Sequence, residues 1–303
     1  MRLKIVFLVS LTMIGCDLVE RDESNNEDKK VQTIEQPRGI DSLTKKPIAS
    51  SNPNEMQNVE GDTVHINVTE LDDEFDYVYS RTLSSGIKIN WIKRNTGAKI
   101  RSGEMLMLEY RLSLPDGRII DGNNKMKMPY LPFVVGYNMQ QLGWDLALQE
   151  MCIGDAAKIE IPSKLAYGSK GLNSIIPPDT DNWLYVKIHG RVEANYNTGG
   201  IKYWELRPGN EVKEKSKVHF HMIASTKNKP NIFNTYQSKF PRTYALGQKN
   251  YPLGLEQILK KAKKGQYLFL ILSPEMAYGE KGYLDLVLPN ESVFYNLKII
   301  DLD

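Results

Sequence analysis

One long segment occurs twice in this sequence, and the repeat limits the folds that the chain can adopt. Residues 161–178 read IPSKLAYGSKGLNSIIPP, and 111 positions later residues 272–289 read LSPEMAYGEKGYLDLVLP. A period of this length is too long for a solenoid and is typical of a duplicated small domain. With 303 residues the chain has room for two such domains. Four glycine pairs recur at the same interval: Gly136 and Gly247, Gly143 and Gly254, Gly154 and Gly265, and Gly168 and Gly279.

Each copy shows strand patterns around one short helical pattern. In the first copy, Asp116 and Gly117 join two apolar runs and predict a hairpin. Trp144, Leu148 and Met151 lie on one stripe of a predicted helix. Strands with a single helix, rather than alternating βαβ units, predict an α+β fold in which each of two tandem domains contains an antiparallel sheet. The predicted strands lie at residues 86–97, 104–114, 118–121, 156–161 and 183–190 in the first copy, and at 200–209, 267–272 and 292–300 in the second.

The N-terminal residues are typical of a bacterial export signal. Arg2 and Lys4 form a basic start, and the apolar run at residues 5–14 is too short to span a bilayer. The sequence Met13-Ile-Gly-Cys16 resembles a lipobox, with Met13 where Leu is usual. The resemblance implies cleavage of a signal peptide at residues 1–15, lipid attached to Cys16, and a protein anchored to a bacterial membrane in the cell envelope, facing the periplasm or the exterior. A plain cleaved signal and a core strand are the alternatives.

The segment that follows Cys16 favours a tether over a folded domain. Residues 17–74 contain no aromatic residue and are rich in Asp, Glu, Asn, Ser and Lys. Such a segment buries too little apolar surface to offset the entropy of ordering it. We therefore predict a lipidated flexible tether at residues 16–80.

Charge and cysteine content narrow the function classes further. The formal charge is +2, and removal of residues 1–15 takes away Arg2 and Lys4 and brings it to zero, so no strong attraction to nucleic acid is expected. Cys16 and Cys152 are the two cysteines. If Cys16 carries lipid, no internal disulfide can form, and we interpret Cys152 as a small buried hydrophobic residue.

The run GWDLALQEMCIGDAAKIEIPSKLAYGSKG at residues 143–171, followed by IIPP, resembles the FKBP-type peptidyl-prolyl cis-trans isomerases. The resemblance covers a domain at residues 81–194 and is specific, because several spaced motifs agree in order. A second domain at residues 195–303 resembles the family more weakly. In this family an antiparallel sheet curls around the short helix, and an apolar pocket between them accepts a proline ring. The resemblance implies proline-containing polypeptide clients, no cofactor and no metal.

The chemistry of this family needs few special groups. Rotation about an X-Pro bond has a barrier of about 18–20 kcal/mol, because twisting the amide loses its resonance. A pocket that holds the proline, strips water from the amide and favours the twisted geometry lowers this barrier. Aromatic walls and a few hydroxyl donors are the expected parts.

The resemblance assigns eight residues of the first domain to this pocket. It implies that Tyr167 donates a hydrogen bond to a substrate carbonyl and that Asp121 polarises the neighbouring groups, as the catalytic pair. The spacing alone also allows purely structural roles: Trp144 as a helix residue of the core, Tyr167 as a packed loop residue and Asp121 as a turn or cap residue. The residues assigned to substrate binding are Tyr110, Phe133, Gln141, Trp144, Ile176 and Leu184.

Departures from the family pattern reduce the number of aromatic residues that line the pocket. Ile120 and Leu184 stand where the family has aromatic residues, Leu172 replaces a loop His, and Gln140 and Gln141 replace an apolar pair. We expect a retained pocket, modest turnover and weakened affinity for the macrolide inhibitors of the family.

The second copy departs further from the pattern. Phe220 replaces the wall Tyr, Asn234 the Asp and Leu255 the indole, while Pro252 stands where a backbone N–H is needed. Tyr278, Phe233, Val287 and Tyr295 still fit pocket positions. We interpret the second domain as a degenerate copy that serves as a binding or structural module.

The leading hypothesis is thus a lipid-anchored isomerase that assists the folding of envelope or surface proteins. The alternative is a non-catalytic peptide-binding or scaffold lipoprotein of a surface, gliding or secretion machine. A hydrolase or metal enzyme is disfavoured, because His219 and His221 share one strand face without evident further ligands. The lysines at 260, 261, 263 and 264 are interpreted as a solvated helix face.

Overall fold

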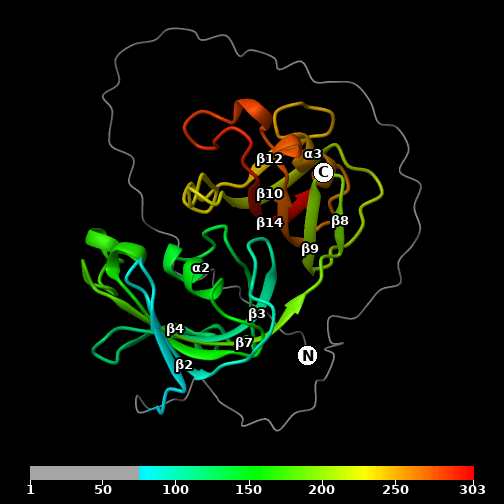
Figure 1. Cartoon of the computed structure of the whole chain (residues 1–303). Helices are drawn as coiled ribbons and strands as arrows, with labels where there is room; N and C mark the ends of the chain where they lie inside the picture. The colour runs from blue at the N-terminus through cyan, green and yellow to red at the C-terminus, as the bar shows by residue number, and fades with distance from the viewer. Residues whose placement is uncertain (1–74) are drawn as a thin grey trace, which may run out of the picture. The chain divides into compact units, whose positions relative to one another are not determined.

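The computed structural model describes residues 75–303, which form two domains of the same topology, each with its own hydrophobic core (Figure 1). The predicted signal peptide, the predicted lipidation site Cys16 and the predicted tether up to residue 74 lie outside the described residues.

The first domain is an antiparallel sheet with one helix in its core. The strand order is β1-β2-β6-β7-β3-β4, with β5 paired to β3. Strand β1 includes Tyr79 and Ser80, which fall at the end of the range predicted as tether. The elements are β1 (Tyr79–Thr82), β2 (Lys88–Lys93), β3 (Met105–Ser113), β4 (Ile119–Gly122), α1 (Asn123–Met126), β5 (Leu131–Val134), α2 (Leu142–Leu148), β6 (Ala156–Ile161) and β7 (Asn182–Val192).

The second domain repeats this connectivity. Its strand order is β8-β9-β13-β14-β10-β11, and β12 pairs with β10 as β5 pairs with β3. The duplicated α+β fold predicted from the 111-residue repeat is therefore confirmed. The elements are β8 (Tyr196–Thr198), β9 (Ile201–Arg207), β10 (Lys217–Ser225), β11 (Phe233–Asn234), β12 (Arg242–Ala245), α3 (Leu253–Lys260), β13 (Tyr267–Leu272) and β14 (Val293–Leu302).

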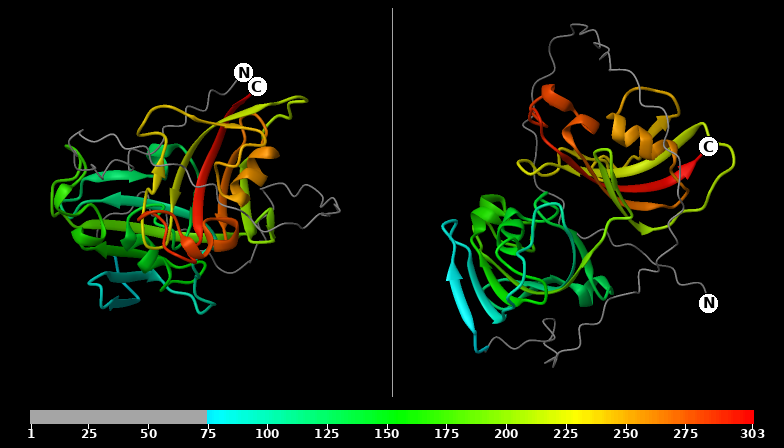
Figure 2. Two further views of the ribbon diagram at one scale, coloured as in Figure 1. Left: turned by 90° about the horizontal axis from the view of Figure 1, so that it is seen from above. Right: turned by 45° about the vertical axis from the view of Figure 1, so that its right-hand side comes forward.

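Each sheet is curved, and its helix lies across the concave side (Figures 1 and 2). Helix α2 presents Trp144, Ala147 and Leu148 to the sheet, and all three are at most 1% exposed. The predicted stripe at i, i+4 and i+7 ends at Met151, which is also fully buried just beyond the helix. The helix thus fills the hollow of the sheet with the apolar face that the sequence pattern predicts.

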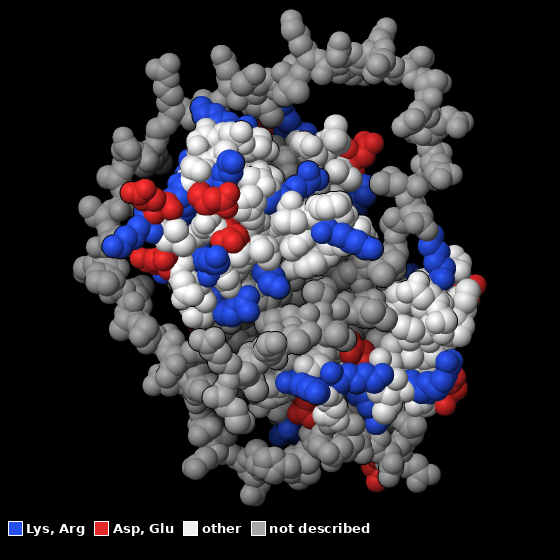
Figure 3. Space-filling view, turned by 180° about the vertical axis from the view of Figure 1, so that it is seen from behind, with Lys and Arg blue, Asp and Glu red and all other residues white. Residues whose placement is uncertain are grey.

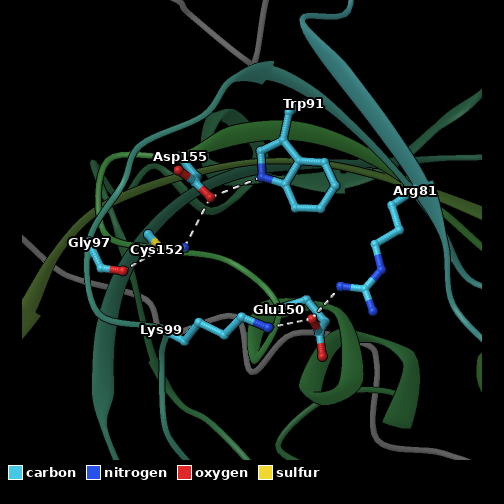
Figure 4. Close-up of polar contacts among 7 residues, drawn as sticks. All are labelled: Arg81, Trp91, Gly97, Lys99, Glu150, Cys152 and Asp155. Carbon is cyan, nitrogen blue, oxygen red and sulfur yellow. Dashed lines mark hydrogen bonds and ion pairs between the residues drawn. The ribbon is translucent and has the colours of Figure 1, made fainter.

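A buried carboxylate joins β2 to the segment after α2 (Figure 4). Asp155 accepts hydrogen bonds from Trp91 Nε1 at 2.9 Å, from the Cys152 N–H at 3.0 Å and from the Asn95 N–H at 2.7 Å. The Cys152 thiol donates to the Gly97 carbonyl at 3.2 Å. Cys152 is a free, buried cysteine that packs as a small core residue.

A half-exposed ion-pair group fastens β1 to the same region (Figure 4). Glu150 Oε2 lies 3.0 Å from Arg81 Nη1 and 2.7 Å from Lys99 Nζ. Both cations lower the pKa of Glu150, Lys99 more than Arg81. Because all three side chains are partly solvated, these ion pairs add little to the free energy of unfolding. Their main effect is to hold β1 in place.

Candidate functional site

Three aromatic rings form the base of the candidate site in the first domain. Trp144 of α2 lies edge-on to the ring of Tyr110 from β3, with centroids 5.2 Å apart, and is stacked on Phe133 of β5 at 5.7 Å. All three side chains are 1% exposed. The pairing of Leu106 with Phe133 holds β5 against β3 and so brings Phe133 to the helix. Centroid distances in this range are the favourable ones for aromatic pairs, so the base is a fixed structure.

A phenol and a carboxylate stand beside this base. The Tyr110 hydroxyl donates to Asp121 Oδ2 at 2.9 Å, and the Gly122 N–H donates to Asp121 Oδ1 at 2.9 Å. Burial, reinforced by the charge of Asp121, raises the pKa of Tyr110 well above its usual range. Tyr110 therefore stays a neutral phenol that orients the carboxylate. Asp121 itself is half-buried, at the rim of the site.

Several buried polar side-chain atoms of this region lack a well-formed hydrogen bond. The Tyr167 hydroxyl is buried and has no hydrogen-bond partner of good geometry, although Gln141 lies close enough to oppose part of the rise in its pKa. That rise comes first from burial and then from Asp121. Gln141 Oε1 and Trp144 Nε1 are likewise buried and unpaired within the described part of the chain. Buried polar groups are ordinarily hydrogen-bonded, so this cluster marks a place where a ligand can supply the partners.

The apolar side of the site is built by the loop between β6 and β7. Ile176 is fully buried with Leu172 and Leu114, and Tyr167 and Ile120 pack against them. Two of the departures from the family pattern, Ile120 and Leu172, thus fill the space beside Tyr167 with aliphatic rather than aromatic or imidazole groups. The site keeps its apolar character there but has fewer ring surfaces.

Leu184 lies in the hydrophobic core of the first domain. It is fully buried on β7, where it pairs with Leu112 of β3 and Ile159 of β6. The structure therefore brings Tyr110, Asp121, Phe133, Trp144, Gln141, Tyr167 and Ile176 together around one base, with Leu184 in the core that supports it.

Met126 is a neighbour of the site that the sequence prediction did not include. Its sulfur accepts a hydrogen bond from the Tyr110 hydroxyl at 3.5 Å. It ends the one-turn helix α1, in the stretch between β4 and β5. Because Asn123 of the same turn accepts a hydrogen bond from the Tyr110 N–H and is buried, α1 is anchored directly to the strand that carries Tyr110.

The other sequence candidates form ordinary structural contacts. His219 lies between Asp303, 2.8 Å away, and the Thr243 hydroxyl at 3.0 Å, while His221 contacts Thr235 at 2.9 Å. Within residues 75–303, no group of three or more His, Cys, Asp or Glu side chains is arranged to hold a metal ion.

Charged side chains of both signs are mixed over the surface. Lys260 and Lys261 are exposed, whereas Lys263 and Lys264 pair with Glu211 at 3.2 Å and Asp301 at 2.7 Å. On the face drawn in Figure 3, basic side chains lie among acidic and uncharged ones. Across the described residues, no helix reaches the length and apolar character needed to cross a bilayer.

Comparisons with known proteins point to one family. A family model described as FKBP-type peptidyl-prolyl cis-trans isomerase matches residues 97–189 and again residues 209–300, which is more than half of the chain. The human peptidyl-prolyl cis-trans isomerase FKBP10 is 25% identical over 214 residues, covering 70% of this chain and 36% of the relative. FK506-binding protein 2 of Kluyveromyces lactis is 39% identical over 84 residues, covering 27% of this chain and 59% of the relative.

The chain spans 36% and 59% of the lengths of these two relatives. Among solved structures, the three FKBP domains of wheat FKBP73 align with 73% of this chain and 96% of that one, at 16% identity and a TM-score of 0.35.

Proposed function

Because the chain belongs to the family of FKBP-type peptidyl-prolyl cis-trans isomerases, we propose that its first domain catalyses the cis/trans isomerisation of X-Pro bonds in polypeptides. The observation that supports this most directly is the ring group of Tyr110, Phe133 and Trp144 beside the unpaired Tyr167 hydroxyl. We infer that the proline ring packs on this ring group and that the Tyr167 hydroxyl donates to a carbonyl of the bound segment.

The proposed mechanism relies on environment and uses no nucleophile. Water stabilises the planar amide, because its resonance places partial charge on the carbonyl oxygen. Seating the proline against Trp144 removes that water and so weakens the preference for the planar amide, while a donor such as Tyr167 holds a neighbouring carbonyl of the bound segment in the orientation that the twisted bond requires. Asp121, held by Tyr110, adds a negative charge that orients the polarised amide. Each contribution is small, so the site suits a reaction that needs only part of its barrier removed.

The activity is tested with a protease-coupled assay on a short prolyl peptide. We expect catalysis above the uncatalysed rate, and a fall of about two- to tenfold in kcat/KM for Tyr167→Phe and for Asp121→Asn, since each removes one interaction worth about 0.5–1.5 kcal/mol. Asp116→Asn, which changes an exposed carboxylate in the β3–β4 turn, serves as the matched control and should retain full activity. A rate equal to background, unchanged in all three variants, would favour the non-catalytic scaffold.

We further propose that the protein acts at a bacterial membrane, on envelope or surface polypeptides, through lipid on Cys16. The support is the basic and apolar start of the sequence followed by the lipobox-like residues before Cys16. One acyl chain alone gives only marginal membrane binding, so two or three chains are needed for stable anchoring.

Replacement of Cys16 tests the anchor. Cys16→Ser should move the protein from the membrane fraction to the soluble fraction and remove the acyl mass from its N-terminal peptide. Cys152→Ser is the control and should remain in the membrane fraction. Equal partitioning of wild type and Cys16→Ser would contradict a lipid anchor.

A further inference from the structure

The second domain contains an aromatic ring group in which Tyr251 takes the part of the indole, although the repeat aligns Leu255 with Trp144. Leu255 of α3 occupies the position of Trp144 and is fully buried. The ring of Tyr251, four residues earlier, lies edge-on to Phe220 at 5.7 Å and to Tyr244 at 6.0 Å.

These contacts correspond in part to those of Trp144 in the first domain. Tyr244 pairs with Val218 on β10 as Phe133 pairs with Leu106 on β3. Phe220, predicted at the position of the wall Tyr, instead pairs with Ile299 directly after a bulge, as Leu108 pairs with Ile188, so Met222 stands at the position of Tyr110. The ring group of the first site therefore has a counterpart in the second, with a phenol in place of the indole.

Tyr251 is held in this position by the start of the helix. Pro252 is the N-cap of α3 with φ −54°, which fixes the chain direction directly after Tyr251. Glu256, 6% exposed, accepts from the Tyr251 N–H at 3.4 Å. Tyr251 is half-buried, so its ring reaches both the core and the solvent side of the site.

Tyr295 and Asn234 are uncharged polar residues of the second domain with a buried side-chain atom that lacks a well-formed hydrogen bond. Tyr295, on β14, is fully buried, and its hydroxyl has no partner of good geometry although Tyr278 lies beside it. The Asn234 Nδ2 group is also buried and unpaired. Asn234 pairs with Ile223 as Gly122 pairs with Arg111, so Phe233, and not Asn234 as predicted, stands at the position of Asp121. The site thus offers hydroxyl and amide donors without the Tyr–Asp pair of the first domain. Such donors match the carbonyl groups of an extended polypeptide.

The loop next to these residues exposes apolar side chains on a strained backbone. Tyr283 contacts the rings of Tyr278 at 4.8 Å and Phe233 at 5.9 Å, and continues the aromatic surface to the solvent. Leu284 follows at φ 48° with 80% of its surface exposed, where the first domain has Asn173 at φ 47°. A left-handed conformation costs a branched residue about 1–2 kcal/mol, whereas Asn tolerates it. Leu284 therefore buries little of its side chain within the domain while its backbone is strained.

We propose that the second domain binds an extended polypeptide at this site, with an apolar side chain or proline ring against Tyr251 and a flanking apolar residue on Leu284, and does not isomerise it. A polypeptide is the ligand that fits, because it alternates carbonyl acceptors with side chains and so matches the alternation of donors and apolar groups. This inference depends on the proposed function in one respect: the sites of both domains are taken to bind polypeptide. Turnover is absent because Met222 and Phe233, which stand at the positions of Tyr110 and Asp121, cannot form the hydroxyl–carboxylate pair of the first domain.

Photo-crosslinking on the full chain tests both sites in one sample. The probe is a twelve-residue peptide that contains Leu-Pro-Leu and one benzoylphenylalanine, and cross-linked tryptic fragments are assigned by mass spectrometry. Wild type should cross-link in both domains. Tyr251→Ala should lower the second-domain yield at least about fivefold, equivalent to about 1 kcal/mol, and leave the first-domain yield unchanged. Tyr251→Phe, which keeps the ring, should cross-link like wild type.

Two further variants guard against loss of folding. Leu284→Asn copies the residue of the first domain and relieves backbone strain, so it should lower the second-domain yield without lowering the melting temperature. Tyr196→Ala removes a ring of the stacked Tyr196–Tyr203 pair elsewhere in the same domain and should leave the yield unchanged. No second-domain cross-links in wild type, or yields unaltered by both Tyr251→Ala and Leu284→Asn, would overturn the proposal. First-domain cross-links and turnover report separately on the proposed isomerase.

Discussion

Trp144→Ala should lower the unfolding free energy of the first domain by about 3–5 kcal/mol and its kcat/KM by more than about tenfold. The indole is 1% exposed and touches the rings of Tyr110 and Phe133, so truncation leaves a large cavity at the centre of the core. The same ring is the proposed seat of the proline. Stability is measured by hydrogen exchange resolved by domain, and kcat/KM is measured at low temperature and corrected for the folded fraction.

Leu148→Ala separates packing from catalysis. Leu148 lies one helical turn after Trp144 on the same face of α2 and is also fully buried. Its truncation should cost about 2–5 kcal/mol of stability but leave the kcat/KM of the folded protein close to wild type. If both variants lose activity in proportion to stability alone, Trp144 is only a core residue and the proposed proline seat is wrong. Trp144→Phe, a milder truncation, provides the same comparison if the alanine variant does not fold.

The elements that sequence reasoning predicted are those with strong local signals. The hairpin at Asp116-Gly117 and the stripe of Trp144 and Leu148 depend on residues close together in the chain, and both are observed. Strands β11 and β12 were not predicted, because residues 226–250 lack a clear alternation. These short strands form by pairing with β10, to which the local pattern gives no clue.

The candidate site divides in the same way. The family resemblance placed Tyr110, Phe133 and Trp144 in one pocket, and the structure brings their rings together. Tyr251 escaped prediction because its ring replaces the indole in space from a different position in the chain. When roles are transferred residue by residue, the loss of the indole at Leu255 is detected. The ring that Tyr251 supplies in its place is missed.

The loop that carries Tyr167 and Ile176 gives the second large effect, for Gly171→Ala. Gly171 has φ 61° and ψ −154°, a region that side chains other than hydrogen scarcely enter. An added Cβ would lie 2.3 Å from the Ile176 carbonyl oxygen, which accepts the Leu172 N–H that closes the loop. We expect a loss of about 3 kcal/mol or more in the first domain, because both strain and a backbone clash must be relieved. Since the loop must open, kcat/KM should fall at least about tenfold.

Gly168→Ala is the matched control within the same loop. Gly168 also has a positive φ, 59°, but an added Cβ meets nothing within 4 Å. Its cost should be the left-handed strain alone, about 1–2 kcal/mol, with little change in kcat/KM.

The duplication supplies a second control, because Gly282 repeats the geometry of Gly171, with its added Cβ 2.3 Å from the Val287 carbonyl oxygen. Gly282→Ala should therefore destabilise the second domain by a similar amount while the isomerase activity stays at the wild-type level, since the proposed chemistry belongs to the first domain. Domain-resolved hydrogen exchange and the prolyl-peptide assay report the two quantities. Equal losses of activity in Gly171→Ala and Gly282→Ala would show that both domains contribute to turnover and would contradict the assignment of catalysis to the first domain alone.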